Sequence, residues 1–166
     1  MNIPATFLRP FLAGRLVAAI VLAFSASAWA QTVQEHVHAH GGQVMPFDVA
    51  KTLHIFRMTE DGGTQKVVVR GDAPEPEQVR LIQQHLETEA AEFQKGNFGD
   101  PAHLHGPAMP GLREMEAGAA RMEITYRALP NGAEIQFRTK DLKLVTAVHR
   151  WFGAQLSEHG ADARAE

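Results

Sequence analysis

The hydrophobic positions of this chain follow first a strand-like and then a helical spacing, and this order occurs twice. Residues 53–58 and 66–69 have the extended, β-branched pattern of strands and flank the turn signal Asp61-Gly62-Gly63, which predicts a β-hairpin. Hydrophobic residues then recur at helical spacing between Asp72, the expected N-cap, and Gly96, the expected end of the helix. This half of the domain is therefore predicted to be a ββα unit.

The second half repeats the pattern. Residues 121–129 alternate between apolar and polar side chains, Pro130-Asn131-Gly132 is a strong hairpin signal, and residues 135–137 continue the second strand. A second helix is expected from about Asp141 to His159. The Gly- and Pro-rich connection between the units, residues 96–118, is expected to be a loop with one short helical turn.

These elements predict an α+β fold: two ββα units that form an antiparallel sheet with the two main helices packed on one face. Four strands with both helices on one face would bury both apolar stripes. Whether the hairpins join edge to edge is left open. The expected organisation is a signal peptide at residues 1–30, a flexible His-rich arm at 31–48, a single α+β domain at 49–160 and a disordered tail at 161–166.

The first thirty residues have the pattern of a secretory signal peptide. Arg9 and Arg15 precede an apolar run at residues 16–24, and Ala28-Trp29-Ala30 resembles a cleavage site. The apolar run is shorter than the roughly 20 residues that span a bilayer. The sequence therefore predicts export to the periplasm and no membrane association after cleavage.

The composition limits the side-chain groups that this protein can use for binding or catalysis. The chain has no cysteine, its nine histidines all follow residue 30, and Ser157 is the one serine after that point. The formal net charge is −3, and removal of the leader with its two arginines makes it more negative. Such a protein offers nucleic acid no basic surface to bind. No G-x-S-x-G, P-loop or H-E-x-x-H motif is present, so a non-catalytic protein is preferred and enzymatic activity is left open.

Three groups of residues are candidate ligands, and the first is in the arm. His36, His38 and His40 alternate along the chain, so in an extended conformation their imidazoles project to one side and could close on one metal ion. Zinc, copper or nickel would accept this arrangement. The alternative is a solvated polar tail.

The second group is in the central connection. His103, His105 and Met109 form the pattern H-x-H-x3-M among glycines and prolines, and Asp100 could add an oxygen ligand. Imidazole with thioether suits copper, especially Cu⁺, because soft ligands select it. The alternative is that Met109 is a hydrophobic anchor that holds the loop on the core.

The third group consists of histidines in the expected strands and helices: His54, His85, His149 and His159. If the two helices lie side by side, His85 and His149 could approach each other and bind a cofactor, either a metal ion or haem iron. The alternative is that each ring is half-buried and hydrogen-bonded to its neighbours, with His159 near the end of its helix. The glutamates of the first helix, Glu87, Glu89 and Glu92, are interpreted as its solvated face.

The chain also resembles a family of small exported bacterial proteins whose members often carry the label "aspartate carbamoyltransferase". The resemblance spans most of the chain after residue 30 and draws attention to histidines 54, 85, 105, 149 and 159 and to Met109. It is carried by these segments: Met45-Pro46-Phe47-Asp48, residues 52–56, Gln84-His85-Leu86, Gly96-Asn97-Phe98, His105-Gly106, Met109-Pro110-Gly111-Leu112, residues 149–155 and His159-Gly160. The label implies a transferase, although the Ser-Thr-Arg-Thr carbamoyl-phosphate loop of transcarbamoylases is absent from this sequence.

The sequence thus predicts a non-catalytic periplasmic metal-binding protein. Copper is the expected ion, and zinc and haem are alternatives. A protein-interaction module with structural histidines, which could form a homodimer, is the alternative function, followed by haem binding or the transferase activity that the label implies.

Overall fold

The computed structural model describes residues 33–166, so the expected signal peptide lies outside the described residues. The helices and strands follow the predicted order, with additional short elements. Their bounds are η1 Val49–Lys51, β1 Thr52–Thr59, β2 Gly62–Val69, α2 Pro76–Gln94, α3 Gly99–His105, α4 Leu112–Gly118, η2 Ala119–Arg121, β3 Glu123–Leu129, β4 Gly132–Arg138, α5 Leu142–His159, η3 Gly160–Asp162 and β5 Ala163–Ala165.

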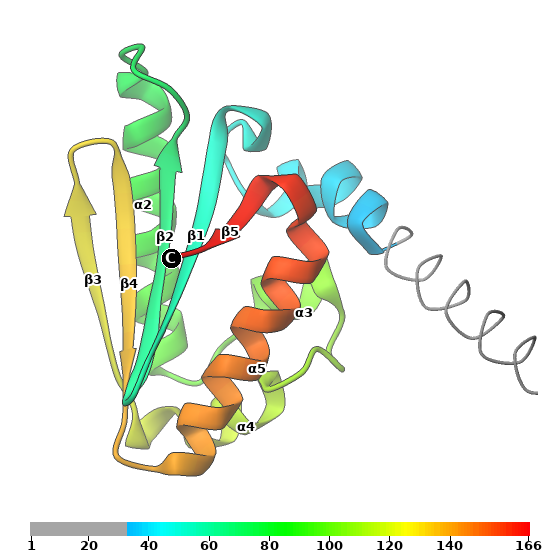
Figure 1. Ribbon diagram of the computed structural model, residues 1–166, viewed down its shortest axis with the longest axis vertical. Coiled ribbons are helices and arrows are strands. Elements are labelled where there is room, and N and C mark those ends of the chain that lie inside the picture. Colours follow the sequence, from blue (N-terminus) through cyan, green and yellow to red (C-terminus); the bar gives the residue numbers. More distant parts are fainter. Residues whose placement is uncertain (1–32) are drawn as a thin grey trace, which may run out of the picture.

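The predicted α+β fold with two ββα units is confirmed. The two hairpins join edge to edge through antiparallel β2 and β4, and one five-stranded sheet results with the order β3-β4-β2-β1-β5. Each main helix packs mostly against the hairpin of the other unit: α2 covers β3 and β4, while α5 covers β1, β2 and β5. In Figure 1 the strands lie in front of α2, and α5 runs beside β1 and β5.

Both helices contact the same face of the sheet, as predicted. Phe56 of β1 and Phe137 of β4 share that face by register, and both rings contact Phe152 of α5. Trp151 is fully buried beside Phe137 and the α2 residue Phe93, with ring centroids 5.5 and 6.0 Å away. Aromatic contacts of this kind add to the free energy of burial, so this cluster fixes how α5 sits against α2.

Two expectations about helix limits were wrong. Helix α2 begins at Pro76, with Glu75 rather than Asp72 as its N-cap, because a residue that precedes proline is disfavoured in helical conformation. The connection at residues 96–118 contains two helices, α3 and α4, instead of one short turn. At α5 the expected cap is confirmed: the carboxylate of Asp141 accepts a hydrogen bond from the Lys143 amide at 2.9 Å.

The expected flexible arm is instead helical over residues 33–44. This helix docks on the domain through Val37, which is 3% exposed, and through a hydrogen bond from Gln34 Nε2 to the Ser157 carbonyl at 2.7 Å. Its His38 lies 3.6 Å from Asp162 in η3. The sequence did not predict this helix because each of its turns has a single apolar residue and the other side chains are polar or small.

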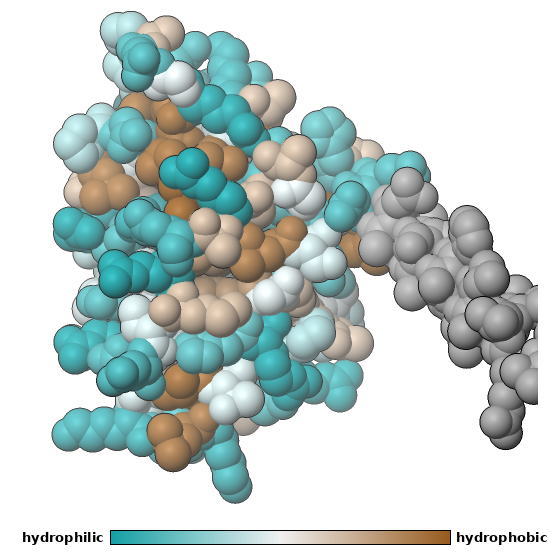
Figure 2. Space-filling view, in the orientation of Figure 1, coloured by the Kyte–Doolittle hydropathy of each residue, from teal (hydrophilic) through white to brown (hydrophobic). Residues whose placement is uncertain are grey.

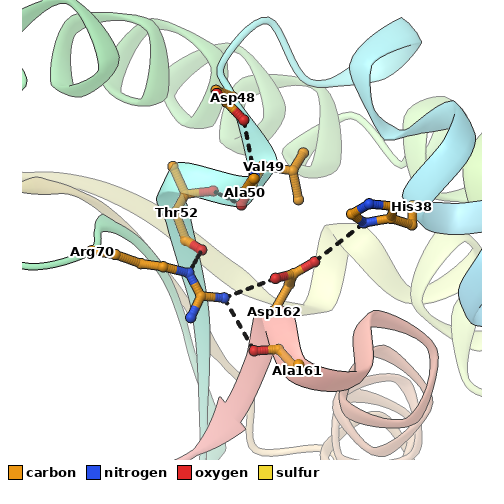
Figure 3. A network of polar contacts seen from close by, with 8 residues as sticks. All are labelled: His38, Asp48, Val49, Ala50, Thr52, Arg70, Ala161 and Asp162. Carbon is orange, nitrogen blue, oxygen red and sulfur yellow. Dashed lines mark hydrogen bonds and ion pairs between the residues drawn. The ribbon is translucent and has the colours of Figure 1, made fainter.

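The expected disordered tail is also ordered. Residues 163–165 form β5, which pairs in parallel with His54 to Phe56 of β1. Arg70 stabilises the turn that precedes β5. Its guanidinium donates hydrogen bonds to the Thr52 carbonyl at 2.6 Å and to the Asp162 carboxylate at 2.8 Å (Figure 3). Helix 33–44, the start of β1 and the C-terminal segment therefore meet at one network of polar contacts.

The opposite face of the sheet carries charged pairs rather than a helix layer. Glu134 of β4 receives hydrogen bonds from Arg127 of β3 at 2.8 Å, and Lys66 of β2 lies 4.0 Å away. Figure 2 shows mostly hydrophilic residues over the strands, with hydrophobic residues in separate patches. Among residues 33–166, no helix combines the length and apolar character that crossing a bilayer requires.

Candidate metal centre

Four histidines from four different elements line one small cavity between the sheet, α2, α3 and the end of α5. They are His54 of β1, His85 of α2, His105 of α3 and His159 of α5. The cavity has a volume of about 50 Å³, and since a water molecule needs roughly 10–15 Å³ it has room for a few such groups. The rest of its lining comprises Val44, Met45, Phe47, Gln65, Val67, Leu86, Glu89, Asp100, Pro101, Leu104, Ile135 and Gln155.

One wall of the cavity carries a set of three metal-ligand side chains. His85, Glu89 and Asp100, here called the metal trio, place one ligand atom each within 4.8 Å of one another. His85 and Glu89 are four residues apart on α2, so they project from the same side of the helix. Asp100 comes from the first turn of α3. Within residues 33–166, no other set of three histidine, aspartate or glutamate side chains brings its ligand atoms this close.

Protonation of Glu89 allows the two carboxyl groups of the metal trio to lie close together. Burial, the charge of Asp100, a hydrogen bond to that side chain and the charge of Glu92 together raise the pKa of Glu89 to about 8, with burial the largest cause. Glu89 therefore keeps its proton at neutral pH and shares it with Asp100. A divalent cation between the two oxygens would replace this proton and remove the repulsion.

The other three histidines lie close together but do not converge on one point. The rings of His54 and His159 stack, with centroids 4.6 Å apart and planes at 20°. His105 meets His159 edge-on, with the centroids 5.1 Å apart. Because the lone pairs of an imidazole lie in its ring plane, two stacked rings direct them past each other and not at a shared ion. A common ion for these three would require the rings to turn.

Burial keeps several of these rings neutral. Desolvation lowers the pKa of His54 to about 4 and is opposed by a hydrogen bond to the backbone of Asp162. Desolvation and the neighbouring histidines lower the pKa of His159 well below 6.5, and desolvation lowers the pKa of His85. Neutral imidazole is the form that binds metal ions, so protons compete weakly for His85 at pH 7.

Contacts behind the cavity fix the orientation of two rings. Nδ1 of His105 lies 2.6 Å from the Glu158 carboxylate, and the His105 side chain is 2% exposed. The backbone of Asp162 accepts a hydrogen bond from the ring of His54. Such partners set which ring nitrogen carries the proton, as carboxylates and carbonyls behind metal ligands do.

Three residues that line the cavity each have one side-chain atom that is buried without a hydrogen-bond partner among the described residues. These atoms are His54 Nδ1, Gln65 Oε1 and Gln155 Oε1. An unpaired buried acceptor costs about 1–3 kcal/mol, so these three atoms reduce the stability of the metal-free fold.

The predicted H-x-H-x3-M ligand set is not assembled. His103 is exposed on α3, whereas His105 points into the cavity, because residues two apart in a helix project to different sides. Met109 is 5% exposed and belongs to the hydrophobic core, which is the alternative interpretation of this residue. Asp100 does lie at the candidate site, but with His85 and Glu89 as its neighbours.

The expected approach of His85 and His149 is wrong. Nε2 of His149 lies 3.0 Å from the Thr59 carbonyl and 2.9 Å from the Gly62 carbonyl, at the turn between β1 and β2. His149 therefore supports the hairpin and lines no part of the cavity. Ligands the size of a drug or larger occupy pockets of about 300 Å³ or more, so the cavity does not fit haem either.

The histidines of helix 33–44 do not form the expected chelate. Helical geometry stacks His36 on His40, with ring centroids 4.2 Å apart, and turns His38 away toward Asp162. Nδ1 of His40 is already engaged by the His36 carbonyl at 2.9 Å.

Sequence reasoning found the four histidines of the cavity but missed Glu89. The spacing H-x3-E from His85 to Glu89 was a usable signal, since it places both side chains on one helix face. Glu89 was instead assigned to the solvated face together with Glu87, which is exposed as expected.

Comparisons with protein-family models, curated proteins and solved structures found no match to this chain. The family resemblance in the sequence therefore stays a prediction, and function has to be inferred from the cavity itself.

Proposed function

We propose that this protein binds one divalent transition-metal ion through His85, Glu89 and Asp100. The observation that carries the proposal is the metal trio itself, with its ligand atoms within 4.8 Å of one another and a proton retained on Glu89. The neutral, oriented histidines on the other side of the cavity support it.

The donor set favours Zn²⁺ or Cu²⁺ over Cu⁺. One imidazole and two carboxylates offer nitrogen and oxygen, and the soft thioether of Met109 lies in the core. Copper thus remains in the proposal as Cu²⁺, which nitrogen and oxygen sites bind most tightly among the divalent first-row ions, with Zn²⁺ as the alternative. Three protein ligands leave coordination positions open, unlike the four ligands of a closed structural zinc site.

We further propose that the protein acts outside the cytoplasm. The support is the charged, apolar and small-residue pattern of residues 1–30. Imidazole and carboxylate groups bind metal ions without thiols, and these groups line the cavity.

The test is a competition titration of the tag-free protein with Zn²⁺ and Cu²⁺ against a chromophoric chelator. We expect one tightly bound ion per chain and at least a tenfold loss of affinity in Glu89→Gln and Asp100→Asn. Glu87→Gln, on the exposed side of the same helix, and His103→Ala, on the exposed side of α3, are the matched controls. Binding that persists unchanged in both trio variants would refute the proposal.

A further inference from the structure

We propose that the edge strand β3 pairs with β3 of a second copy of this chain, so that the two sheets join into one continuous antiparallel sheet. The proposal does not depend on the metal site. It rests on the free edge of β3, on the charges of the sheet face opposite the helices, and on the order of residues 123–127, which is complementary to itself.

β3 is the last strand at one end of the sheet and pairs only with β4 among the described residues. Figure 1 shows it at the outer margin of the sheet. Because the turn between Leu129 and Gly132 has two residues, the odd-numbered residues of β3 exchange backbone hydrogen bonds with β4. Ile124, Tyr126 and Ala128 therefore direct their N–H and C=O groups outward. Such a row of groups is a template for another strand.

A side chain of α2 already reaches this edge. Nε2 of Gln94 donates a hydrogen bond to the Ile124 carbonyl at 2.5 Å, which agrees with an outward direction of that carbonyl. A carbonyl oxygen has two lone pairs, so the Ile124 carbonyl can accept a second hydrogen bond from an added strand. Gln94 therefore leaves the edge available for pairing.

The side chains of β3 select one register for a symmetric pair. With the two-fold axis at Thr125, Glu123 lies directly opposite the partner's Arg127, and Ile124 lies opposite the partner's Tyr126. The two Thr125 residues then face each other. Opposite charges, a β-branched residue with an aromatic one, and two threonines are all cross-strand pairs that stabilise antiparallel sheets. An axis at Arg127 would instead bring two guanidinium groups together.

This register also continues a row of alternating charges. Within one chain Lys66 of β2 lies opposite Glu134 of β4, and Glu134 lies opposite Arg127. The Arg127 side chain is still 66% exposed although it donates to Glu134. Glu123 is exposed as well and lies opposite Arg138. In the dimer each Arg127 is placed between its own Glu134 and the partner's Glu123, which completes the charge row across both sheets.

The other edge of the sheet offers no comparable match. β5 has only three residues, and Arg164 is its central one. Antiparallel pairing of two β5 strands would place the two Arg164 side chains opposite each other, and like charges in that position are destabilising. Very short edge strands also resist pairing. Association through β3 alone gives a closed two-fold dimer rather than a chain of molecules.

The experiment is sedimentation velocity of the tag-free protein with a chelator present, at concentrations from about 1 µM to about 1 mM. We expect a reversible monomer–dimer equilibrium. Arg127→Glu and Glu123→Arg, each alone, should raise the dimer dissociation constant at least tenfold, because like charges then face each other. An equimolar mixture of the two variants should form a heterodimer at least tenfold tighter than either variant alone, since each carries the charges opposite to those of the other.

The control is Arg57→Glu, which reverses a charge on the same face of the sheet but on β1, and it should dimerise like the wild type. If either edge variant fails to fold, Thr125→Lys replaces it, because this exposed position puts two positive charges at the axis. A monomeric wild-type protein at all concentrations would overturn the proposal. Wild-type dimerisation in the edge variants, or a mixture that stays monomeric, would overturn it too.

Discussion

Replacement of Glu89 by glutamine tests whether a proton shared with Asp100 stabilises the metal-free protein. The folded-state pKa of Glu89 is about 8, against 4.5 for the ordinary carboxyl group. An acid with a raised pKa holds more protons in the folded state, so its contribution to the free energy of unfolding falls as pH rises between these two values. Glutamine mimics the protonated acid and removes this dependence.

The buried histidines define the useful pH window. The pKa values of His54, at about 4, and of His159 lie below 6.5, so these rings cost stability only when pH falls below 6.5. Between pH 6.5 and 8 the histidine contributions change little, and they change equally in the wild type and in Glu89→Gln, so the difference between the two proteins reports Glu89. A loss of 1.36 kcal/mol per pH unit would give about 2 kcal/mol over this window, and half-ionisation of Glu89 at pH 8 together with its partial exposure reduces the loss to about 1 kcal/mol.

The assay is urea unfolding in the presence of a chelator at pH 6.5 and pH 8, followed by far-ultraviolet circular dichroism. The wild-type protein should lose about 1 kcal/mol between the two pH values, or about 4 °C in melting temperature, relative to Glu89→Gln. Glu87→Gln should follow the wild type. Equal changes in the wild type and Glu89→Gln would show that Glu89 titrates below this window and would refute the shared proton.

Two further substitutions separate structural residues from ligands. His149→Ala should lower the free energy of unfolding by about 1–3 kcal/mol in urea titrations, because the Thr59 and Gly62 carbonyls lose their partner. Its zinc affinity should stay the same, and weakened zinc binding would contradict this assignment. Met109→Leu conserves volume in the core, so it should change stability by less than about 1.5 kcal/mol and leave copper affinity unaltered in the chelator competition. Loss of copper binding would restore Met109 as a ligand.

The two ββα units could be predicted because their signals are local. Pro130-Asn131 forms the hairpin turn between Leu129 and Gly132, Asp141 caps α5, and the apolar period of α2 is regular over several turns. The strand at residues 163–165 could not be predicted in this way, because it depends on parallel pairing with β1, more than a hundred positions earlier. Helix 33–44 likewise depends on Val37 finding a place on the finished domain.

The site was only partly visible in the sequence for the same reason. Residue type pointed to histidines, and His54, His85, His105 and His159 do share a cavity. Their grouping was wrong because it followed neighbours in the chain. His103 and Met109 were joined to His105, although α3 turns His103 to the exposed side and Met109, beyond α3, lies in the core. The partners of His85 are Glu89, one helical turn away, and Asp100, which reaches it only after α3 folds against α2.

The central claim is tested most directly by locating the ion. Crystals of the protein grown with Zn²⁺ should give one strong anomalous peak at the zinc edge, bounded by His85 Nδ1 or Nε2, a Glu89 oxygen and an Asp100 oxygen at about 2.0–2.2 Å. A cavity without such a peak, or zinc bound only at His36 and His40 on the surface, would contradict the account.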